Sequence, residues 1–335
     1  MSDRSSPRGG AAWTLGMAAL LLGVVPAILA LLDYGYFFRL AQLAMIFAIL
    51  SASLNLTAGT TGLLSLGHAA FYGVGAYVAA LLSTRAGLPP ALTIPAAFLF
   101  TAGLAAILAL PTIRLVRIFF AVATLSIGEL INLTLSNWNG LTNGPMGVRG
   151  IPGMSLFGVD LSGRVGSYYA VAVVAIAAIW AIHRLTHSYW GNMLRAVRED
   201  DQAAMGMGIR VAGMKVAVFA ISSGFAGVAG ALLAHSTNFI SPDMFRLTES
   251  ILILTMVVVG GLGSVAGAVA GACLLVFLPE LGREVGHFRM VIVGIVLFAA
   301  IVALPRGLVG EVSTLDFARR HLGRAGRSDP PAGWR

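Results

Sequence analysis

Residues 188–215 read SYWGNMLRAVREDDQAAMGMGIRVAGMK and form the only long interior segment in which charged residues cluster. Almost everything on either side of this polar segment, apart from the two ends and several loops, is apolar enough to lie in the hydrocarbon of a membrane. The polar segment is therefore expected to face water and an aqueous partner. The apolar runs beside it are expected to form a membrane-embedded body.

The composition places the chain among polytopic membrane proteins. Its 335 residues are 58% hydrophobic and 11% charged, whereas a soluble domain carries about 25% charged residues. Apolar runs of about 20 residues recur, and each can cross the hydrocarbon core as a helix. Strands of a membrane barrel would alternate apolar and polar residues instead. The predicted fold class is an all-α integral membrane protein.

About ten membrane-spanning helices are expected, some of them short or discontinuous. Their ranges are 11–32, 38–56, 68–84, 91–110, 118–136, 167–186, 216–235, 249–259, 265–278 and 288–304. The first follows two arginines and lacks a small-residue cleavage site, which favours a retained span over a removed signal. The eighth and ninth are shorter than the roughly 17 residues of an upright span, so they either borrow flanking residues or form a re-entrant pair.

The charge distribution predicts an orientation. With ten spans and the N-terminus inside, fifteen Lys and Arg residues lie inside and seven outside, as the positive-inside rule requires. We therefore attribute the net charge of +8 to orientation rather than to nucleic-acid binding. The tails 1–10 and 306–335 and the polar segment 188–215 are expected to be cytoplasmic. Residues 11–305 form the expected transmembrane domain, in which the Gly- and Pro-rich stretch 137–166 is an external loop.

The stretch 59–77, GTTGLLSLGHAAFYGVGAY, holds the first candidates for a transport pathway. Its glycines permit close helix approach. Ser65, His68 and Tyr72 recur at helical spacing, and an ionisable group at membrane depth is a functional candidate because it is costly unless it faces a cavity or a partner. A neutral His68 that links helices through its ring nitrogens is the alternative, and we favour it over direct substrate contact.

Glu129 lies well inside an expected span, and Asn132 follows three residues later on the same helix face. Its carboxyl group either faces a wet cavity, is protonated, or is paired with a buried partner. A proton relay would need further buried acids and bases, and the sequence offers only His68, so none is expected.

Two glycine-interrupted segments, 62–65 (GLLS) and 261–264 (GLGS), share their spacing. Transporters carry such segments at corresponding places in their two halves, near the pathway, but glycine-rich membrane sequences also match by chance. Both interpretations stay open. The series Gly263, Gly267 and Gly271 is a doubled GxxxG pattern, which predicts close helix packing within the chain or across a subunit interface.

Within the polar segment, residues 192–205 have the pattern of one short amphipathic helix, ended by Gly206 and Gly208. Its three consecutive acids, 199–201, would be repelled by an anionic membrane surface, which favours a protein partner. Lys215 is the only lysine and no Gly-Lys pair exists, so a phosphate-binding GxxxxGK[ST] loop is excluded and any ATP hydrolysis belongs to another chain. No catalytic motif points to an enzyme, and the single Cys273 excludes a disulfide or a cysteine metal site within the chain.

Five blocks of sequence together resemble the LivM-type permease subunits of ABC importers for branched-chain amino acids, in the hydrophobic amino-acid uptake family. The blocks are Leu54-Asn55-Leu56 with residues 65–71 (SLGHAAF), Gly128-Glu129 with Asn137-Trp138 and Gly144-Pro145, residues 195–200 (RAVRED) with Ala203-Ala204 and Gly208-Ile209, residues 260–264 (GGLGS), and residues 305–308 (PRGL). The resemblance covers most of the chain. It implies the permease fold of an ABC importer, for which inverted repeats are one interpretation of the paired glycine segments.

The resemblance also implies partners and a location. These are a sister permease in a heterodimer, two cytoplasmic ATPase subunits that bind ATP and Mg²⁺, an external substrate-binding protein, and the bacterial cytoplasmic (inner) membrane. The polar segment then corresponds to the helix that couples to an ATPase, with candidate residues Arg195, Ala196, Arg198, Glu199, Asp200, Ala203, Ala204 and Gly208. The candidates for the translocation pathway are Asn55, Ser65, His68, Tyr72, Glu129, Asn132, Gly261, Gly263 and Ser264. No catalytic residue, metal or cofactor is expected in this chain.

Several positions depart from the family pattern and leave the substrate open. They are Leu63 in place of Gln, Asn132 in place of a basic residue, Asn143 and Met146 around the Gly-Pro pair, and Ala268 in place of Pro. Branched-chain or other hydrophobic amino acids are the expected substrates, and urea, other amides or aromatic acids are the alternatives. A stand-alone channel or secondary carrier is the competing class of protein.

Overall fold

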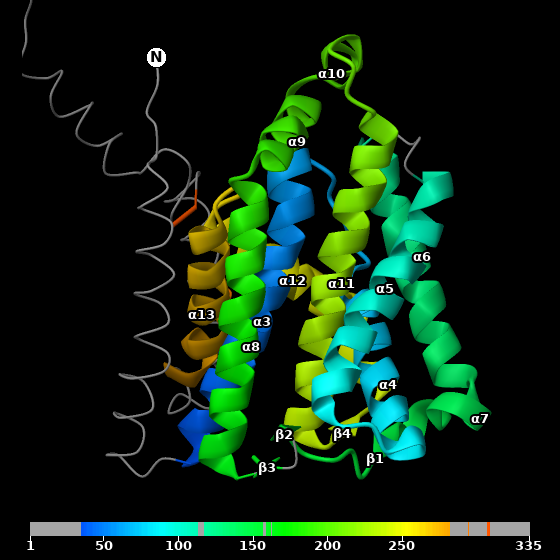
Figure 1. Ribbon diagram of the computed structural model, residues 1–335, viewed down its shortest axis with the longest axis vertical. Helices are drawn as coiled ribbons and strands as arrows, with labels where there is room; N and C mark the ends of the chain where they lie inside the picture. The colour runs from blue at the N-terminus through cyan, green and yellow to red at the C-terminus, as the bar shows by residue number, and fades with distance from the viewer. Residues whose placement is uncertain are drawn as a thin grey trace, which may run out of the picture.

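The computed structural model describes residues 35–112, 117–156, 159–161, 163–281, 294, 307 and 308. These residues form a bundle of long helices (Figure 1). The helices are α3 (Gly35–Thr61), α4 (His68–Ala86), α5 (Pro90–Thr112), α6 (Arg117–Asn137), α7 (Asn139–Thr142), α8 (Arg164–Thr186), α9 (Tyr189–Glu199), α10 (Asp201–Gly206), α11 (Val211–Thr237), α12 (Leu247–Gly260) and α13 (Val265–Leu281), with 3₁₀ turns η2 (Gly144–Met146) and η3 (Pro242–Phe245). Short strands are β1 (Val148–Arg149), β2 (Ser155–Leu156), β3 (Val159–Asp160) and β4 (Phe239–Ile240).

The eight expected spans from 38–56 to 265–278 are all helical in the structure. By length and composition, five of the described helices can cross a membrane, namely α3, α5, α6, α8 and α11. The chain is thus a largely helical, multi-pass membrane protein. The expected spans 11–32 and, apart from Gly294, 288–304 lie outside the described residues. The total of ten spans and the side of the termini stay predictions.

Two helices, α3 and α11, form the centre of the bundle. Both are mostly buried along their length, whereas α5 and α6 expose most of theirs. Small residues let neighbouring backbones touch at this centre. A Cβ atom on Gly75 of α4 would lie 2.2 Å from the Cα of Gly227 on α11, and one on Gly230 would lie 2.1 Å from the carbonyl oxygen of Tyr72. Close backbone contact of this kind is a main source of helix association in membranes, where the hydrophobic effect between helices is weak.

The two short expected spans, 249–259 and 265–278, lie in α12 and α13, which run in opposite directions along the bundle. After α11, the chain forms β4 at one end of the bundle, passes through η3, and completes the crossing as α12, whose 14 residues extend only about 21 Å. Helix α13 then returns to the first end. The path along the bundle that contains α12 is therefore discontinuous: β4 and η3 form its first part, and the α-helix begins only at Leu247.

The doubled GxxxG pattern packs α13 against α12 within the same chain. A Cβ atom on Gly260 would lie 2.1 Å from the carbonyl oxygen of Gly267, and one on Gly271 would lie 2.9 Å from the Cα of Gly260. Of the two interpretations of this pattern, packing within the chain is the one that the structure shows.

The Gly- and Pro-rich stretch 137–166 forms turns and short extended pieces, as its composition predicts. It contains α7, η2, β1 and the antiparallel β2–β3 pair. Strand β1 pairs antiparallel with β4, with Val148 opposite Ile240 and Arg149 opposite Phe239. This pairing ties the stretch to the end of α11. These elements lie at the end of the bundle opposite α9 and α10 (Figure 1).

Candidate functional site

The polar segment forms two short helices, α9 and α10, which stand at one end of the bundle between α8 and α11 (Figure 1). Ser188 caps α9, where its hydroxyl accepts a hydrogen bond from the Gly191 N–H at 3.4 Å. Leu194 and Val197 are fully buried, so the apolar face of α9 packs on the end of the bundle. The amphipathic sequence explains this arrangement, because the apolar face of the helix is buried and its polar face is exposed.

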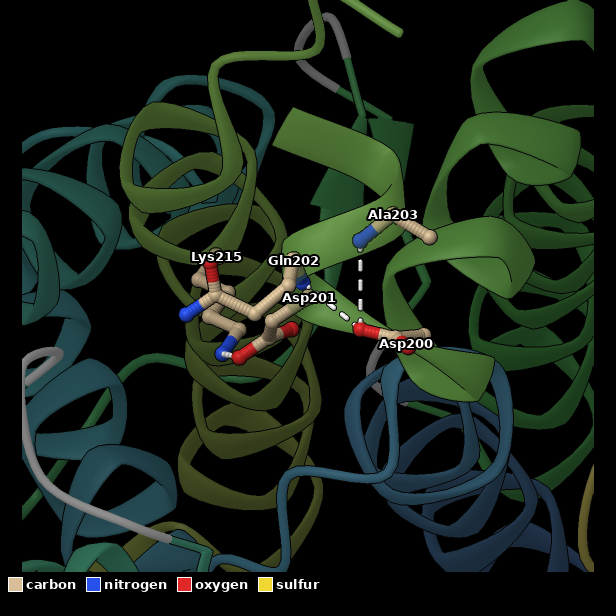
Figure 2. Close-up of polar contacts among 5 residues, drawn as sticks. All are labelled: Asp200, Asp201, Gln202, Ala203 and Lys215. Carbon is tan, nitrogen blue, oxygen red and sulfur yellow. Dashed lines mark hydrogen bonds and ion pairs between the residues drawn. The ribbon is translucent and has the colours of Figure 1, made fainter. Parts of the chain in front are cut away.

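The expectation of one continuous helix over residues 192–205 is wrong. Asp200 leaves helical geometry, with φ −153° and ψ 114°, and its side chain begins a second helix. Its Oδ1 accepts hydrogen bonds from the backbone N–H groups of Gln202 at 2.8 Å and Ala203 at 3.1 Å (Figure 2). An aspartate that caps a new helix competes with continuation of the old one. In the sequence Asp200 was taken as one of three consecutive acids and as a coupling residue, although Asp is among the strongest N-cap residues.

Lys215 ties this second helix to the bundle. Its Nζ forms an ion pair with Oδ2 of Asp201 (Figure 2). The lysine side chain is only 10% exposed, and it projects from the first turns of α11. The pair fixes α10 over the start of α11, while Gly208, at φ 82°, makes the turn between the two helices.

The structure divides the predicted coupling residues into two groups. Glu199, Asp200, Ala203 and Gly208 are exposed, and Arg195 and Ala196 are partly exposed. Ala204 is 2% exposed and packs with Val197 and Val211, so it holds the segment together. Arg198 is partly buried and points into the chain, toward α3.

Three exposed apolar side chains on this segment were not among the predicted coupling residues. Tyr189 is 80% exposed, Met207 81% and Met205 47%. Their signal in the sequence was the presence of large apolar residues in a segment that is otherwise polar. Exposed methionines adapt well to a partner's surface. Together with Glu199 and Ala203, these three residues form what we call the docking face.

A chain of contacts leads inward from α9. Arg198 donates a hydrogen bond from Nη1 to the carbonyl oxygen of Gly59 on α3 at 2.6 Å. One turn earlier on α3, Oδ1 of Asn55 accepts a hydrogen bond from the Gly263 N–H at 2.9 Å. A Cβ atom on Gly59 would lie 2.5 Å from that same nitrogen. Asn55, Gly261, Gly263 and the helix-capping Ser264 thus belong to the end of the bundle that carries α9.

The glycine segments 62–65 and 261–264 lie at this same end, because Gly59 and Gly263 are in contact. An inverted relation would place them at opposite ends. Helices α4 and α12 begin side by side and run in opposite directions. Their first turns are joined by a hydrogen bond of 3.0 Å from the Ala69 N–H to Oγ of Ser250. Helix α4 ends near α7, where Arg85 bonds to Leu141. Helix α12 ends at the other end of the bundle, where Gly263 bonds to Asn55 of α3.

His68 links α4 to α3 at this meeting point. Its Nε2 lies 2.9 Å from Oγ of Ser53, and that hydroxyl donates its proton to the carbonyl oxygen of Leu50 at 2.8 Å. A neutral imidazole can make this contact as donor or as acceptor, depending on which ring nitrogen carries the proton. Nδ1 of His68 and Oγ of Ser65 are buried with no hydrogen-bond partner among the described residues. The Ser53 contact favours a neutral, helix-linking His68.

Tyr72 points elsewhere. Its ring is 2% exposed and stacks edge-on against Phe245, with centroids 5.1 Å apart. The expected cluster of Ser65, His68 and Tyr72 is therefore spread over different neighbours, since His68 contacts α3 and Tyr72 contacts η3. Helical spacing predicted that the three residues lie within two turns of one another, but it could not predict which helix each side chain contacts.

A small cavity lies where α4 and α12 begin. Its lining includes Gly67, Ser250, Glu129 and Asn132, and its volume of about 10 Å³ holds about one water molecule. Asn132 donates from Nδ2 to the carbonyl oxygen of Pro242 at 2.9 Å. Glu129 is exposed on the surface of the chain. The structure thus brings Glu129 and Asn132 to the paired helix starts, away from the group around Asn55.

Metal-binding geometry is not found in the part of the chain that the structure describes, where no three His, Cys, Asp or Glu side chains gather. Cys273 is a partly buried free cysteine in α13.

Comparison with protein families and curated proteins gives consistent results. The family described as "Branched-chain amino acid transport system / permease component" matches residues 36–303. The LivM high-affinity branched-chain amino acid permease of Escherichia coli K12 is 34% identical over 293 residues, which cover 81% of this chain and 69% of that protein. The LivM protein of Salmonella typhimurium LT2 gives the same values.

A second kind of permease is also similar. The LivH branched-chain amino acid permease of Escherichia coli K12 is 24% identical over 300 residues, which cover 82% of this chain and 94% of that protein. No solved structure matches the chain significantly.

Proposed function

Because the chain belongs to the branched-chain amino acid transport system permease family, we propose that it is the membrane-spanning permease subunit of an ABC importer for branched-chain amino acids. In this role the chain forms half of a translocation pathway and relies on separate ATPase subunits. It carries no ATPase site of its own, because its sequence has no phosphate-binding loop. The bacterial cytoplasmic membrane is its proposed location.

The observation that carries this proposal is the construction of the α9–α10 segment. Its inner face is fixed by Leu194, Val197 and the Asp201–Lys215 pair, while its docking face is left exposed. A rigid projection with an exposed acidic and methionine-rich surface is suited to a protein partner in water. We assign that partner as an ATPase subunit that binds ATP and Mg²⁺.

Motion of such a partner has a defined route into the bundle. The Arg198–Gly59 hydrogen bond joins α9 to α3, and the Asn55–Gly263 bond joins α3 to the α12–α13 connection. Helix α12 leads from there to the cavity beside Glu129. A displacement of α9 by the partner would therefore reach the start of α12 through a continuous series of contacts. Coupling between distant sites is carried by contacts of this kind.

Glu129 supports the proposal of a second permease subunit and a wet pathway. A carboxyl group exposed on the surface of a spanning helix is costly against lipid. If a sister permease packs against this face of α6 and an aqueous path runs between the two subunits, Glu129 faces water and that cost disappears. The paired starts of α4 and α12 place the positive ends of two helix dipoles at this region, which suits the carboxylate of an amino acid.

Purification of the complex from membranes tests the proposal. Isolating the chain under mild detergent is expected to recover two copies of an ATPase and one second permease. With an external binding protein that carries leucine, isoleucine or valine, the complex in liposomes should take up that amino acid only with ATP. Flux through the purified chain alone without ATP would instead identify a channel or secondary carrier. ATP-driven uptake of urea, an amide or an aromatic acid, with none of leucine, would reassign the substrate.

A further inference from the structure

An apolar groove lies between α4, α5 and α6, in the half of the bundle away from α9. Its volume is about 590 Å³. Its walls include Val74 on α4, Phe100 on α5 and Leu135 on α6. The groove forms because α5 and α6 make few contacts with each other, and Phe100 and Trp138 on its rim are each more than half exposed. It therefore opens on the outer surface of the bundle.

The groove continues into a polar pocket. The two share Leu81 and Leu141, and the pocket adds a volume of about 340 Å³. Arg85 and Arg149 line it together with hydroxyl and amide side chains, and none of the described residues that line it is acidic. Along α4 the wall changes from Val74 to Arg85, a length of roughly 16 Å at 1.5 Å per residue. The combined cavity is apolar at one end and basic at the other.

Both arginines are held in position by the protein. Arg85 donates from Nη2 to the carbonyl oxygens of Gly140 at 3.0 Å and Leu141 at 2.9 Å, which uses two of its five N–H donors. The guanidinium of Arg149 lies over the ring of Phe239, 5.5 Å from its centroid, a cation–π contact. A charged ligand would thus meet cations whose side chains are already ordered.

We propose that this cavity binds one anionic phospholipid from the leaflet opposite α9 and α10. An acyl chain fills the groove, and the phosphate lies between Arg85 and Arg149. In a bilayer, acyl chains enter an apolar groove without selectivity, because lipid tails are as apolar as the side chains. The selectivity comes from the arginine pair, since guanidinium groups form short, charge-assisted hydrogen bonds with phosphate.

Two features favour a lipid over a protein helix as the occupant. The basic pocket complements a negatively charged head group, and it adjoins the groove at the end where α4 leaves the bundle. Trp138 lines the groove next to the short helix α7, which carries the acceptors of Arg85, and tryptophan is enriched at the depth of lipid head groups. The site does not depend on the transport function proposed above, because it is built from the outer surface of the bundle.

Lipid retention by the full chain, in the complex in which it is isolated, tests the site. The complex is placed in nanodiscs of phosphatidylcholine with a minor fraction of phosphatidylglycerol, re-extracted, and its retained lipids are counted by native mass spectrometry. The unchanged chain is expected to enrich phosphatidylglycerol over phosphatidylcholine. Arg85→Gln with Arg149→Gln should lower that enrichment roughly tenfold, since two charge-assisted contacts are lost. Arg149→Gln alone should give an intermediate loss and leaves the Arg85 contacts in place.

Matched variants separate the site from general effects. Arg39→Gln removes an exposed arginine at the same end of the bundle and should not change the enrichment. Ala96→Trp fills the groove from α5 and should reduce it, whereas Leu99→Trp, on the exposed face of α5 outside the groove, should not. Equal retention of both lipids by the unchanged chain and all variants would overturn the proposal. So would efficient crosslinking of a cysteine at position 96 to another membrane subunit, because a protein helix would then fill the groove.

Discussion

Arg198 on α9 donates a 2.6 Å hydrogen bond from Nη1 to the carbonyl oxygen of Gly59 on α3. Gly59 lies near the end of α3, directly against Gly263 in the α12–α13 connection. The arginine therefore connects the helix that faces the cytosolic partner, in our proposal, with the end of α3 and, through Gly59, with the glycine-interrupted segment 261–264. A residue that looked like part of a docking surface in the sequence is an internal link in the structure.

Replacing this link is expected to uncouple transport from ATP hydrolysis. Arg198→Ala removes a charge-assisted hydrogen bond of about 1.5–3 kcal/mol, so the amino acid taken up per ATP hydrolysed should fall about tenfold. Basal hydrolysis should persist, because the docking face is unchanged. Both rates are measured in liposomes that contain the whole complex. Arg210→Ala, at an exposed position of the same segment, is the control, and an equal loss in both variants would contradict the assigned link.

The cap at Asp200 is expected to determine how firmly α10 is folded. Asp200→Ala removes the acceptor for the N–H groups of Gln202 and Ala203, at a cost of about 1 kcal/mol. Cleavage by trypsin within residues 195–215 should therefore speed up about fivefold. Asp200→Asn keeps a capping oxygen and should be cleaved at nearly the original rate. Faster cleavage of the Asn variant to the same degree would mean that charge, not capping, matters here.

The contact between α4 and α11 is expected to tolerate no added methyl group. Gly75→Ala places a Cβ atom 2.2 Å from the Cα of Gly227, and such overpacking costs about 1–3 kcal/mol. The thermal midpoint of the detergent-solubilised chain should fall by several degrees. Gly103→Ala, in α5, meets nothing within 4 Å and should be neutral or slightly stabilising. Equal midpoints for the two variants would contradict the close approach.

Glu129 is expected to face water in the assembled complex. In a chain with Cys273→Ser, a cysteine at position 129 should react with a membrane-impermeant maleimide. Leu130 is 66% exposed on the next position of α6 and does not line the cavity, so a cysteine there should be protected by lipid. The labelled fraction is measured by gel shift. Protection at 129 and reaction at 130 would show that the pathway lies on another face of α6.

Much of the helical framework follows from the sequence, because membrane spans are determined by local apolar length. The expected span 216–235, for example, lies inside α11, Val211–Thr237. Discontinuity was also signalled, since the 11-residue stretch 249–259 was too short to cross alone. The cause of the discontinuity could not be predicted from the sequence. The part of the chain before α12 depends on η3 and on the pairing of β4 with β1, and that pairing joins segments far apart in the sequence.

The candidate site was predicted less completely. The polar segment was correctly placed outside the apolar body, because charge clustering is a local property. The break at Asp200 depends on whether one side chain caps a helix or faces solvent, and the same residues allow both. The partner of His68 was equally hidden, because Ser53 precedes it by 15 residues and lies on another helix. Three glycines at 224, 227 and 230 did carry an unused signal of close packing.

Coupling between the docking face and an ATPase is the central claim, and Glu199→Lys tests it most directly. Glu199 is exposed on the surface of the described residues, so the variant should insert into the membrane and purify normally. In the reconstituted complex with the substrate-loaded binding protein, substrate-stimulated ATP hydrolysis should fall severalfold, because a reversed charge at a docking surface disfavours the complex. Unchanged stimulation of hydrolysis in that variant would contradict the account.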